Sequence, residues 1–326
     1  MENLMNLEMR LLQDRCGTRA IIEHSEQNAE WIFENLIEKG EQWIISGAPK
    51  AGKSRLALQL ALSASEGASF LDFKCPRKQR VLYVDFELSP RISAHRVLDF
   101  YKNDREKLIM NKSFYKCSDH KIIDVNSTNH CNLIKNIVET LKPDLVIWDV
   151  LARMHSADEN NNIAMTQVMQ NIRLLSCGAA HIVVHHARKE IYGNGGAKSL
   201  RGASSIHGEA DGVMALALEN SKMKSYSLLF STRAIDDPGK IWLKGDGLGF
   251  IKVTKIAADE KNKSQLILGE IFKDQTTITK AALKNFIEAS LEIRDRQAER
   301  KIDELVLSGK LLKTKKGREM LYSHVK

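Results

Sequence analysis

The chain has 326 residues and a formal net charge of +8, and 43% of its residues are hydrophobic. That length allows about two domains, each with its own core. No apolar run reaches the ~18 residues of a membrane span, and the N-terminus lacks the layout of a secretory signal, so we expect a cytoplasmic protein without a membrane partner. The five cysteines form no C-x-x-C pair, which predicts reduced and mostly buried thiols instead of disulfides or a zinc cluster.

Residues 1–25 predict a short helical extension. Leu4, Leu7, Leu11 and Leu12 stand at helical spacing and form an apolar stripe. This stripe has two interpretations: it packs on a neighbouring subunit, or it lies on the core of its own chain.

The most specific motif is a phosphate-binding loop. It follows an apolar run at 43–45, which predicts a strand, and it precedes an amphipathic helical run at 55–62. In such loops, backbone N–H groups and a helix N-terminus face the phosphate oxygens, the lysine reaches the β- and γ-phosphates, and the serine ligates Mg²⁺. The sequence therefore predicts ATP and Mg²⁺ as cofactors. We assign nucleotide binding to Gly47, Ala48, Pro49, Lys50, Ala51, Gly52, Lys53, Ser54 and Arg55.

Further apolar runs at 81–84, 145–148 and 181–184 alternate with helical patterns. This alternation predicts an α/β fold with a mostly parallel sheet covered by helices on both faces. Ligands of such sheets bind beyond the carboxyl ends of the strands, so the polar residues at those ends are the candidates for a site.

Acidic residues follow two of these runs. Asp85 and Glu87 end one run, where Glu87 can orient and polarise an attacking water, and Asp149 ends the next, where an acid supports Mg²⁺. Each acid alone is weak evidence. Together, after a phosphate loop, they favour nucleotide hydrolysis.

The fourth run ends in His185 and His186, where a side chain could sense the γ-phosphate. Adjacent residues of a strand point to opposite faces, so only one histidine can approach the phosphate and the other is structural. A paired-histidine metal site is a poorer interpretation, because no further His or Cys stands at helical i+4 spacing.

A glycine-rich stretch at 191–202 carries Lys198 and Arg201 and predicts a loop. Its cations could bind a nucleic-acid backbone, or the stretch could be a simple surface excursion. Strand-like runs follow at 212–218 and 226–230, and the second delivers Arg233 to a turn as a candidate charge donor.

The tail, residues 259–326, predicts three helices at 266–272, 280–289 and 294–307 and then a hairpin. This order resembles a winged helix, with Ile302, Leu305 and Val306 toward its core. Residues 261–326 hold 15 Lys or Arg and 9 Asp or Glu, which suggests a polyanion partner or simply a solvated basic surface. Winged helices bind DNA or proteins. The candidate DNA contacts are Arg296 and Arg300 on the third helix and Lys315 and Lys316 at the wing.

Residues 26–258 resemble the RecA-like ATPases of the hexameric replicative helicases, most closely the plasmid RepA type, with DnaB and RadA more distant. The matching residues are the lead-in 31–37 with Gly40, the loop 47–54, 84–87, Asp149 with 151–155 and 158–160, His185 and His186 with Lys189, and 201–205.

The resemblance implies roles for single residues. Glu87 would be the catalytic base, Asp149 the acid that supports Mg²⁺, and His186, three residues before Lys189, the γ-phosphate sensor. An arginine from the neighbouring subunit would complete each site, with Arg233 preferred and Arg201 second. The family therefore implies a homo-oligomer, expected as a hexamer, with single-stranded DNA in its channel and possible duplex contact by the tail.

The sequence thus favours an ATP-driven motor on single-stranded DNA that replicates a plasmid, phage or similar element. Two alternatives stay open: a RecA-like DNA-binding ATPase without unwinding activity, serving as a loader, recombination mediator or defence component, and a regulator whose winged helix is switched by ATP on duplex DNA. A small-molecule kinase fits less well, because no separate acceptor pocket or lid arginine cluster is visible.

Overall fold

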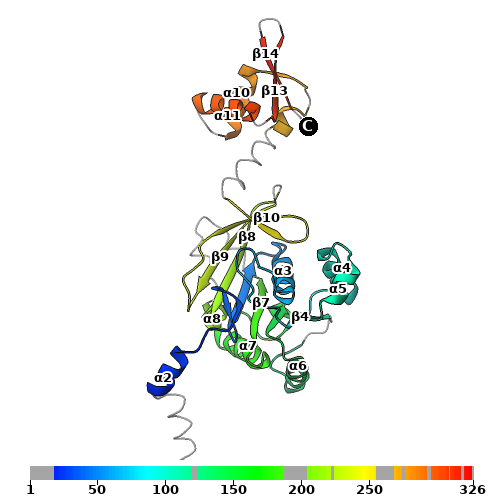
Figure 1. Cartoon of the computed structure of the whole chain (residues 1–326), viewed down its shortest axis with the longest axis vertical. Coiled ribbons are helices and arrows are strands. Elements are labelled where there is room, and N and C mark those ends of the chain that lie inside the picture. The colour runs from blue at the N-terminus through cyan, green and yellow to red at the C-terminus, as the bar shows by residue number, and fades with distance from the viewer. Residues whose placement is uncertain are drawn as a thin grey trace, which may run out of the picture. The chain divides into compact units, whose positions relative to one another are not determined.

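The computed structural model describes residues 18–118, 123–186, 204–221, 224–254, 268–273, 276–291, 295–307, 309–316 and 319–324. The chain divides into two compact units. The larger contains residues 1–218, 227–241 and 245–251, and the smaller contains 219–226, 242–244 and 252–326. Figure 1 shows the described helices and strands of both.

The elements before residue 254 alternate between strands and helices over most of their length. In chain order they are α2 (Thr18–Ser25), β1 (Trp31–Phe33), β2 (Ile37–Glu38), β3 (Gln42–Gly47), α3 (Lys53–Glu66), β4 (Val81–Asp85), α4 (Pro90–Phe100), α5 (Arg105–Met110), β5 (Phe114–Ser118), α6 (Thr128–Leu141), β6 (Leu145–Asp149), the 3₁₀ turn η1 (Leu151–Arg153), α7 (Asn162–Leu175), β7 (Ala180–His186), α8 (Ser204–Glu209), β8 (Gly212–Asn220), β9 (Ser225–Thr232), β10 (Ile241–Gly245) and β11 (Phe250–Val253).

Nine of these strands form one sheet in the order β11-β10-β9-β8-β3-β7-β6-β4-β5. The six neighbours from β8 to β5 are all parallel. Their register places Gly47 beside His186 and Asp85 beside Asp149. The predicted α/β fold with a mostly parallel sheet is confirmed, and its carboxyl edge collects the strand ends that the sequence singled out.

Helices cover both faces of the sheet (Figure 1). Leu82, Val146 and Trp148 belong to a buried cluster that also contains residues of α6 and α7. Tyr83 alternates with Leu82 along β4 and points to the opposite face, where its hydroxyl oxygen lies 3.3 Å from the carbonyl oxygen of Ser54 in α3. Helix α3 thus packs on the face opposite α6 and α7.

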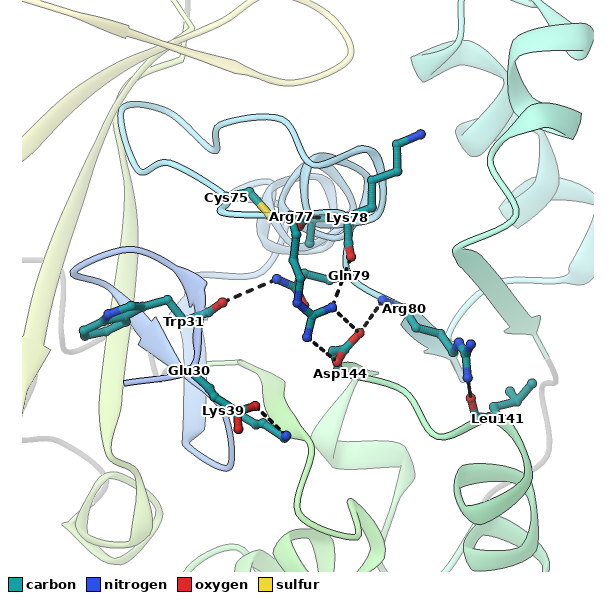
Figure 2. Close-up of polar contacts among 11 residues, drawn as sticks. Glu30, Trp31, Lys39, Cys75, Arg77, Lys78, Gln79, Arg80, Leu141 and Asp144 are labelled. Carbon is teal, nitrogen blue, oxygen red and sulfur yellow. Dashed lines mark hydrogen bonds and ion pairs between the residues drawn. The ribbon is translucent and has the colours of Figure 1, made fainter. Parts of the chain in front are cut away.

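Polar contacts fix the amino edge of the sheet (Figure 2). The carboxylate of Asp144 forms an ion pair with Arg77 at 3.1 Å and accepts the backbone N–H of Arg80 at 2.8 Å. The Arg80 guanidinium donates to the carbonyl of Leu141 at 2.9 Å, which satisfies a group at the C-terminus of α6. These contacts hold the loop before β4 against the strand beside it.

The tail unit contains β12 (Ile278–Thr279), α10 (Lys280–Leu291), α11 (Asp295–Leu307), β13 (Leu311–Lys316) and β14 (Glu319–His324). A short helical turn precedes them at 268–271. The strands form an antiparallel sheet in the order β12-β14-β13, the arrangement of a winged helix. Ile302 and Leu305 are buried in its core and Val306 packs against it, so the predicted inner face of α11 is confirmed.

The expectation of mostly buried cysteines is wrong. Of the four cysteines in the described residues, Cys75 is buried, Cys131 is half-buried, and Cys117 and Cys177 are exposed. Cys117 lies on β5, the edge strand, and Cys177 lies in a left-handed turn after α7. Within the described ranges, no helix has the length and apolar character needed to cross a membrane.

Candidate functional site

The phosphate loop connects β3 to α3 and requires glycine at two places. A Cβ on Gly47 would lie 2.5 Å from the carbonyl oxygen of Leu216, and a Cβ on Gly52 would lie 2.9 Å from Cζ of Phe250. Gly52 also has a φ of 97°, in the left-handed region that favours glycine. The close approach of β8 and of Phe250 explains why side chains are excluded from both ends of the loop.

Lys53 curls back into the loop. Its ammonium donates to the carbonyls of Gly47 at 3.0 Å and Ala48 at 2.9 Å, and it lies 2.9 Å from Nδ1 of His186. Burial lowers the pKa of Lys53 to about 8, while nearby Asp149 and Glu87 act in the opposite direction. The ammonium therefore remains mostly charged at pH 7, at the centre of a loop shaped for phosphate.

The two neighbouring histidines lie on opposite faces, as predicted. His186 faces Lys53, and because an ammonium can only donate, Nδ1 accepts and the ring proton is assigned to Nε2. Burial, followed by the charge of Lys53, lowers the pKa of His186, so the ring is neutral with an N–H to offer. His185 is buried, and burial lowers its pKa to about 4.

Asp149 is 2% exposed and ends β6 directly beside the start of α3. Ser54 donates to its Oδ1 at 3.1 Å, and Tyr83 donates to its Oδ2 at 2.6 Å. Burial raises the pKa of Asp149 to about 6, against the hydrogen bonds of Tyr83 and Ser54, so it is ionised at pH 7. A carboxylate and a hydroxyl in contact are hard oxygen donors of the kind that Mg²⁺ prefers, so the residues fit this ion.

Glu87 is exposed in the turn between β4 and α4. Its charge acts on both Lys53 and His186, which places it at the same edge of the sheet. Asp85 accepts the backbone N–H of Glu87 at 3.1 Å and thereby fixes the turn. The structure therefore gathers five predicted residues at one site: Lys53, Ser54, Glu87, Asp149 and His186.

Arg233 lies elsewhere. It is exposed, its backbone N–H donates to the carbonyl of Asp211 at 3.0 Å, and its guanidinium donates to the carbonyl of Gly208. Asp211 also accepts the backbone N–H of Gln42 at the start of β3, so Arg233 is at the amino edge, opposite the phosphate loop. It does not approach the nucleotide site of its own chain.

The remaining predicted contact residues lie in different surroundings. The guanidinium of Arg55 stacks 4.3 Å from the ring centroid of Phe250 and donates to the carbonyl of Gly247, so its side chain packs against β11 and its nucleotide contact stays a prediction. Lys198 and Arg201 lie outside the described residues. In the tail, Arg296, Arg300 and Lys315 are exposed, and Lys316 ends β13.

Sequence reasoning assigned no role to Tyr83 or Lys116, which support the site from behind. Lys116 on β5 forms an ion pair with Asp85 at 3.1 Å. Tyr83 is an aromatic residue inside an apolar strand, and nothing in that pattern shows that its hydroxyl reaches Asp149. Only the lysine within the run 114–118 gave a signal, since a cation on a half-buried strand needs an anionic partner.

Comparison with known proteins places this geometry in a family. Residues 13–191, more than half of the chain, match the family model AAA_25, described as an AAA domain. No significant match exists among curated proteins. A KaiC-like protein of the hyperthermophilic archaeon Pyrococcus horikoshii OT3 has a similar structure, with a TM-score of 0.50, 14% identity and an alignment that covers 68% of this chain and 94% of that one. The chain therefore belongs to the AAA_25 family of AAA domains and is a P-loop NTPase with a RecA-like core.

Proposed function

We propose that the protein is an ATP-hydrolysing motor on single-stranded DNA, of the RepA-type hexameric replicative helicase kind, that serves a plasmid, phage or mobile element. The observation that carries the hydrolytic part is the meeting of Lys53, Glu87 and Asp149 at one sheet edge. A protein that only binds nucleotide as a switch needs Lys53 and the acid that supports Mg²⁺, Asp149. The solvent-accessible carboxylate of Glu87 beside them is suited to a further task, the activation of water.

The chemistry follows from the positions of these side chains. The carboxylate of Glu87 orients a water molecule and accepts its proton while the water oxygen bonds to the γ-phosphorus and the bond to the β,γ-bridging oxygen breaks, which releases ADP and phosphate. Lys53 and the Nε2 hydrogen of His186 donate to phosphate oxygens on which charge accumulates. When bound, Mg²⁺ would be held by Ser54, with Asp149 supporting it, and would neutralise charge on the β- and γ-phosphates.

Exposed cations in the tail support a nucleic-acid contact. Asp295 and Glu299 of α11 pair with Lys284 and Lys280 of α10, so these four charges cancel, while Arg296 and Arg300 of α11 are exposed. Lys313 and Lys315 on β13 are exposed as well. In this proposal the two arginines meet duplex DNA. Single-stranded DNA in the channel would contact Lys198 and Arg201.

The position of Arg233 excludes a role at its own phosphate loop, so in this proposal it acts between subunits. A cation at the amino edge cannot serve its own phosphate loop, but an oligomer could bring it to the site of a neighbour. Arginine fingers contribute about 10³–10⁵ in rate, so the isolated monomer should hydrolyse ATP slowly. Mixing inactive Arg233→Ala subunits with inactive Glu87→Gln subunits should restore activity, and failure to do so despite proven co-assembly would exclude this finger.

The test of the motor is the ATPase rate without DNA, with single-stranded DNA and with duplex DNA at one fixed low salt concentration, followed by an unwinding assay. The proposal predicts strong stimulation by single strands and DNA unwinding. Stimulation without unwinding would favour a loader or mediator. Stimulation by duplex alone would instead support a regulator that ATP switches through its winged helix.

A further inference from the structure

Lys116 is a half-buried cation that the nucleotide chemistry does not use. Its side chain is 13% exposed, and its ammonium lies 3.1 Å from Oδ2 of Asp85, 4.5 Å from the ring centroid of Tyr83 and 3.3 Å from Oγ of Ser118. It lies on the edge strand β5, and no other described strand pairs beyond it. Burial of a charge is costly, so this contact set requires an explanation.

One branch of contacts runs from Lys116 to the turn that carries Glu87. Oδ2 of Asp85 accepts from Lys116 and from Oγ of Ser93 at 2.5 Å, while Oδ1 accepts the backbone N–H groups of Glu87 at 3.1 Å and Leu88 at 3.0 Å. Burial alone would raise the pKa of Asp85, but Lys116 and these hydrogen bonds lower it, so the acceptor is a carboxylate. The turn that carries Glu87 is therefore held by the carboxylate of Asp85, which is in turn paired with the ammonium of Lys116.

The other branch runs to Asp149, the acid that would support Mg²⁺. The ring of Tyr83 lies beneath Lys116, and its hydroxyl donates to Oδ2 of Asp149 at 2.6 Å, a shorter contact than the 3.3 Å to the carbonyl of Ser54. Complete burial raises the pKa of Tyr83, so the phenol keeps its proton and remains a donor. The contact between the Lys116 ammonium and the Tyr83 ring thus links β5 to the residue that donates to Asp149.

We propose that Lys116, Asp85 and Tyr83 form a positioning network in which one half-buried cation sets the places of both Glu87 and Asp149. In this proposal the three residues act through their neighbours Glu87 and Asp149. The proposal rests on the hydrolytic function above and extends it to the edge of the sheet.

Tyr83→Phe tests the branch to Asp149, because it keeps the ring and removes only the hydroxyl. Mg²⁺ should increase the affinity for a fluorescent ATP analogue. The readout is the Mg²⁺ concentration at which half of this increase is reached, and it requires no turnover. Loss of a hydrogen bond to a group that supports a metal ion should raise this concentration about 10-fold and leave Mg²⁺-free binding within about twofold. Tyr115→Phe, the same change on the exposed part of β5, should have no effect. A Tyr83→Phe variant that matches Tyr115→Phe would overturn this branch.

The branch to Glu87 is tested with Asp85→Asn, Lys116→Met and the double variant. Each single change leaves a buried group without its partner and can unfold the core, whereas the double change removes both charges together. The double variant should fold like the wild type and bind the ATP analogue normally. Its kcat should fall about 10-fold or more with KM within about threefold, as for loss of an interaction felt in the transition state. A folded double variant with wild-type kcat would refute the branch.

The outcomes separate the two proposals. If the wild type hydrolyses ATP and all network variants match it, the network is wrong and the hydrolytic function stands. If the wild type binds the analogue but does not hydrolyse it, the hydrolytic function fails, and the Mg²⁺ titration of Tyr83→Phe still decides whether Tyr83 positions Asp149.

Discussion

Asp149→Asn should stabilise the core of the protein without nucleotide. Asp149 is buried, and its pKa is raised from 3.8 to about 6, so the folded state holds its proton more tightly than the unfolded chain. Such a group destabilises the fold once the pH exceeds the folded pKa, and this penalty disappears below the unfolded pKa. At about 1.4 kcal/mol per pKa unit, the penalty at pH 7.5 is about 3 kcal/mol.

Asparagine removes the charge and keeps the local contacts. Its carbonyl can accept from Tyr83, and its amide can donate to the hydroxyl of Ser54, the two partners of the native carboxylate. The free energy of unfolding should therefore rise by up to about 3 kcal/mol at pH 7.5 and by about half as much at pH 5, where folded Asp149 is mostly protonated.

The assay is urea unfolding followed by tryptophan fluorescence at both pH values. Trp31, Trp43 and Trp148 lie in the larger unit and Trp242 in the smaller, so the signal reports mainly the core. Asp72→Asn, a change at an exposed acid, provides the control for loss of one surface charge. An Asp149→Asn variant that is less stable than the wild type at pH 7.5, or whose gain does not depend on pH, would refute the reasoning.

Three further predictions concern the loop and the tail. ATP affinity should fall as the pH rises above about 8, because phosphate binding raises the lowered pKa of Lys53 and takes up a proton. Isothermal titration calorimetry over pH 6–9.5 measures this dependence. The same slope of affinity against pH in Lys53→Ala would contradict it. Gly52→Ala should abolish analogue binding. Adding Phe250→Leu, which removes the close contact, should leave binding at least about 5-fold weaker than in the wild type, because the φ of 97° still costs an L-residue about 1–2 kcal/mol. Ile302→Ala should destabilise the tail by about 2–5 kcal/mol, because it removes a buried side chain. Hydrogen exchange should become faster in α10 and α11 and stay unchanged in α3. Equally faster exchange in both units would disprove independent cores.

Much of the core followed from local patterns. The apolar runs gave strands β3, β4, β6 and β7, and because parallel strands share a carboxyl edge, their last residues had to converge. Lys53 and Asp149 could thus be placed in one site from the sequence. Part of the tail could be predicted for a similar reason, because the helical spacing of Ile302 and Leu305 identifies the inner face of α11.

What escaped prediction depends on contacts between distant segments. Phe250 closes on Gly52 from almost 200 residues away, and no local pattern records that approach. The location of Arg233 depends on how β9 runs beside β8, which a strand assignment alone does not give. Lys116 and Tyr83 meet because β5 pairs with β4 in one register, so their joint support of the site appears only in the folded chain.

The central claim, that Glu87 activates water at a site formed by Lys53, Asp149 and His186, is tested most directly by single-turnover ATP hydrolysis with wild type and Glu87→Gln at equal occupancy. Binding of a fluorescent ATP analogue verifies that occupancy. Removing the base should leave affinity within about twofold and slow hydrolysis by about 10² or more. Hydrolysis by Glu87→Gln at the wild-type rate, with ATP bound equally, would contradict the assignment.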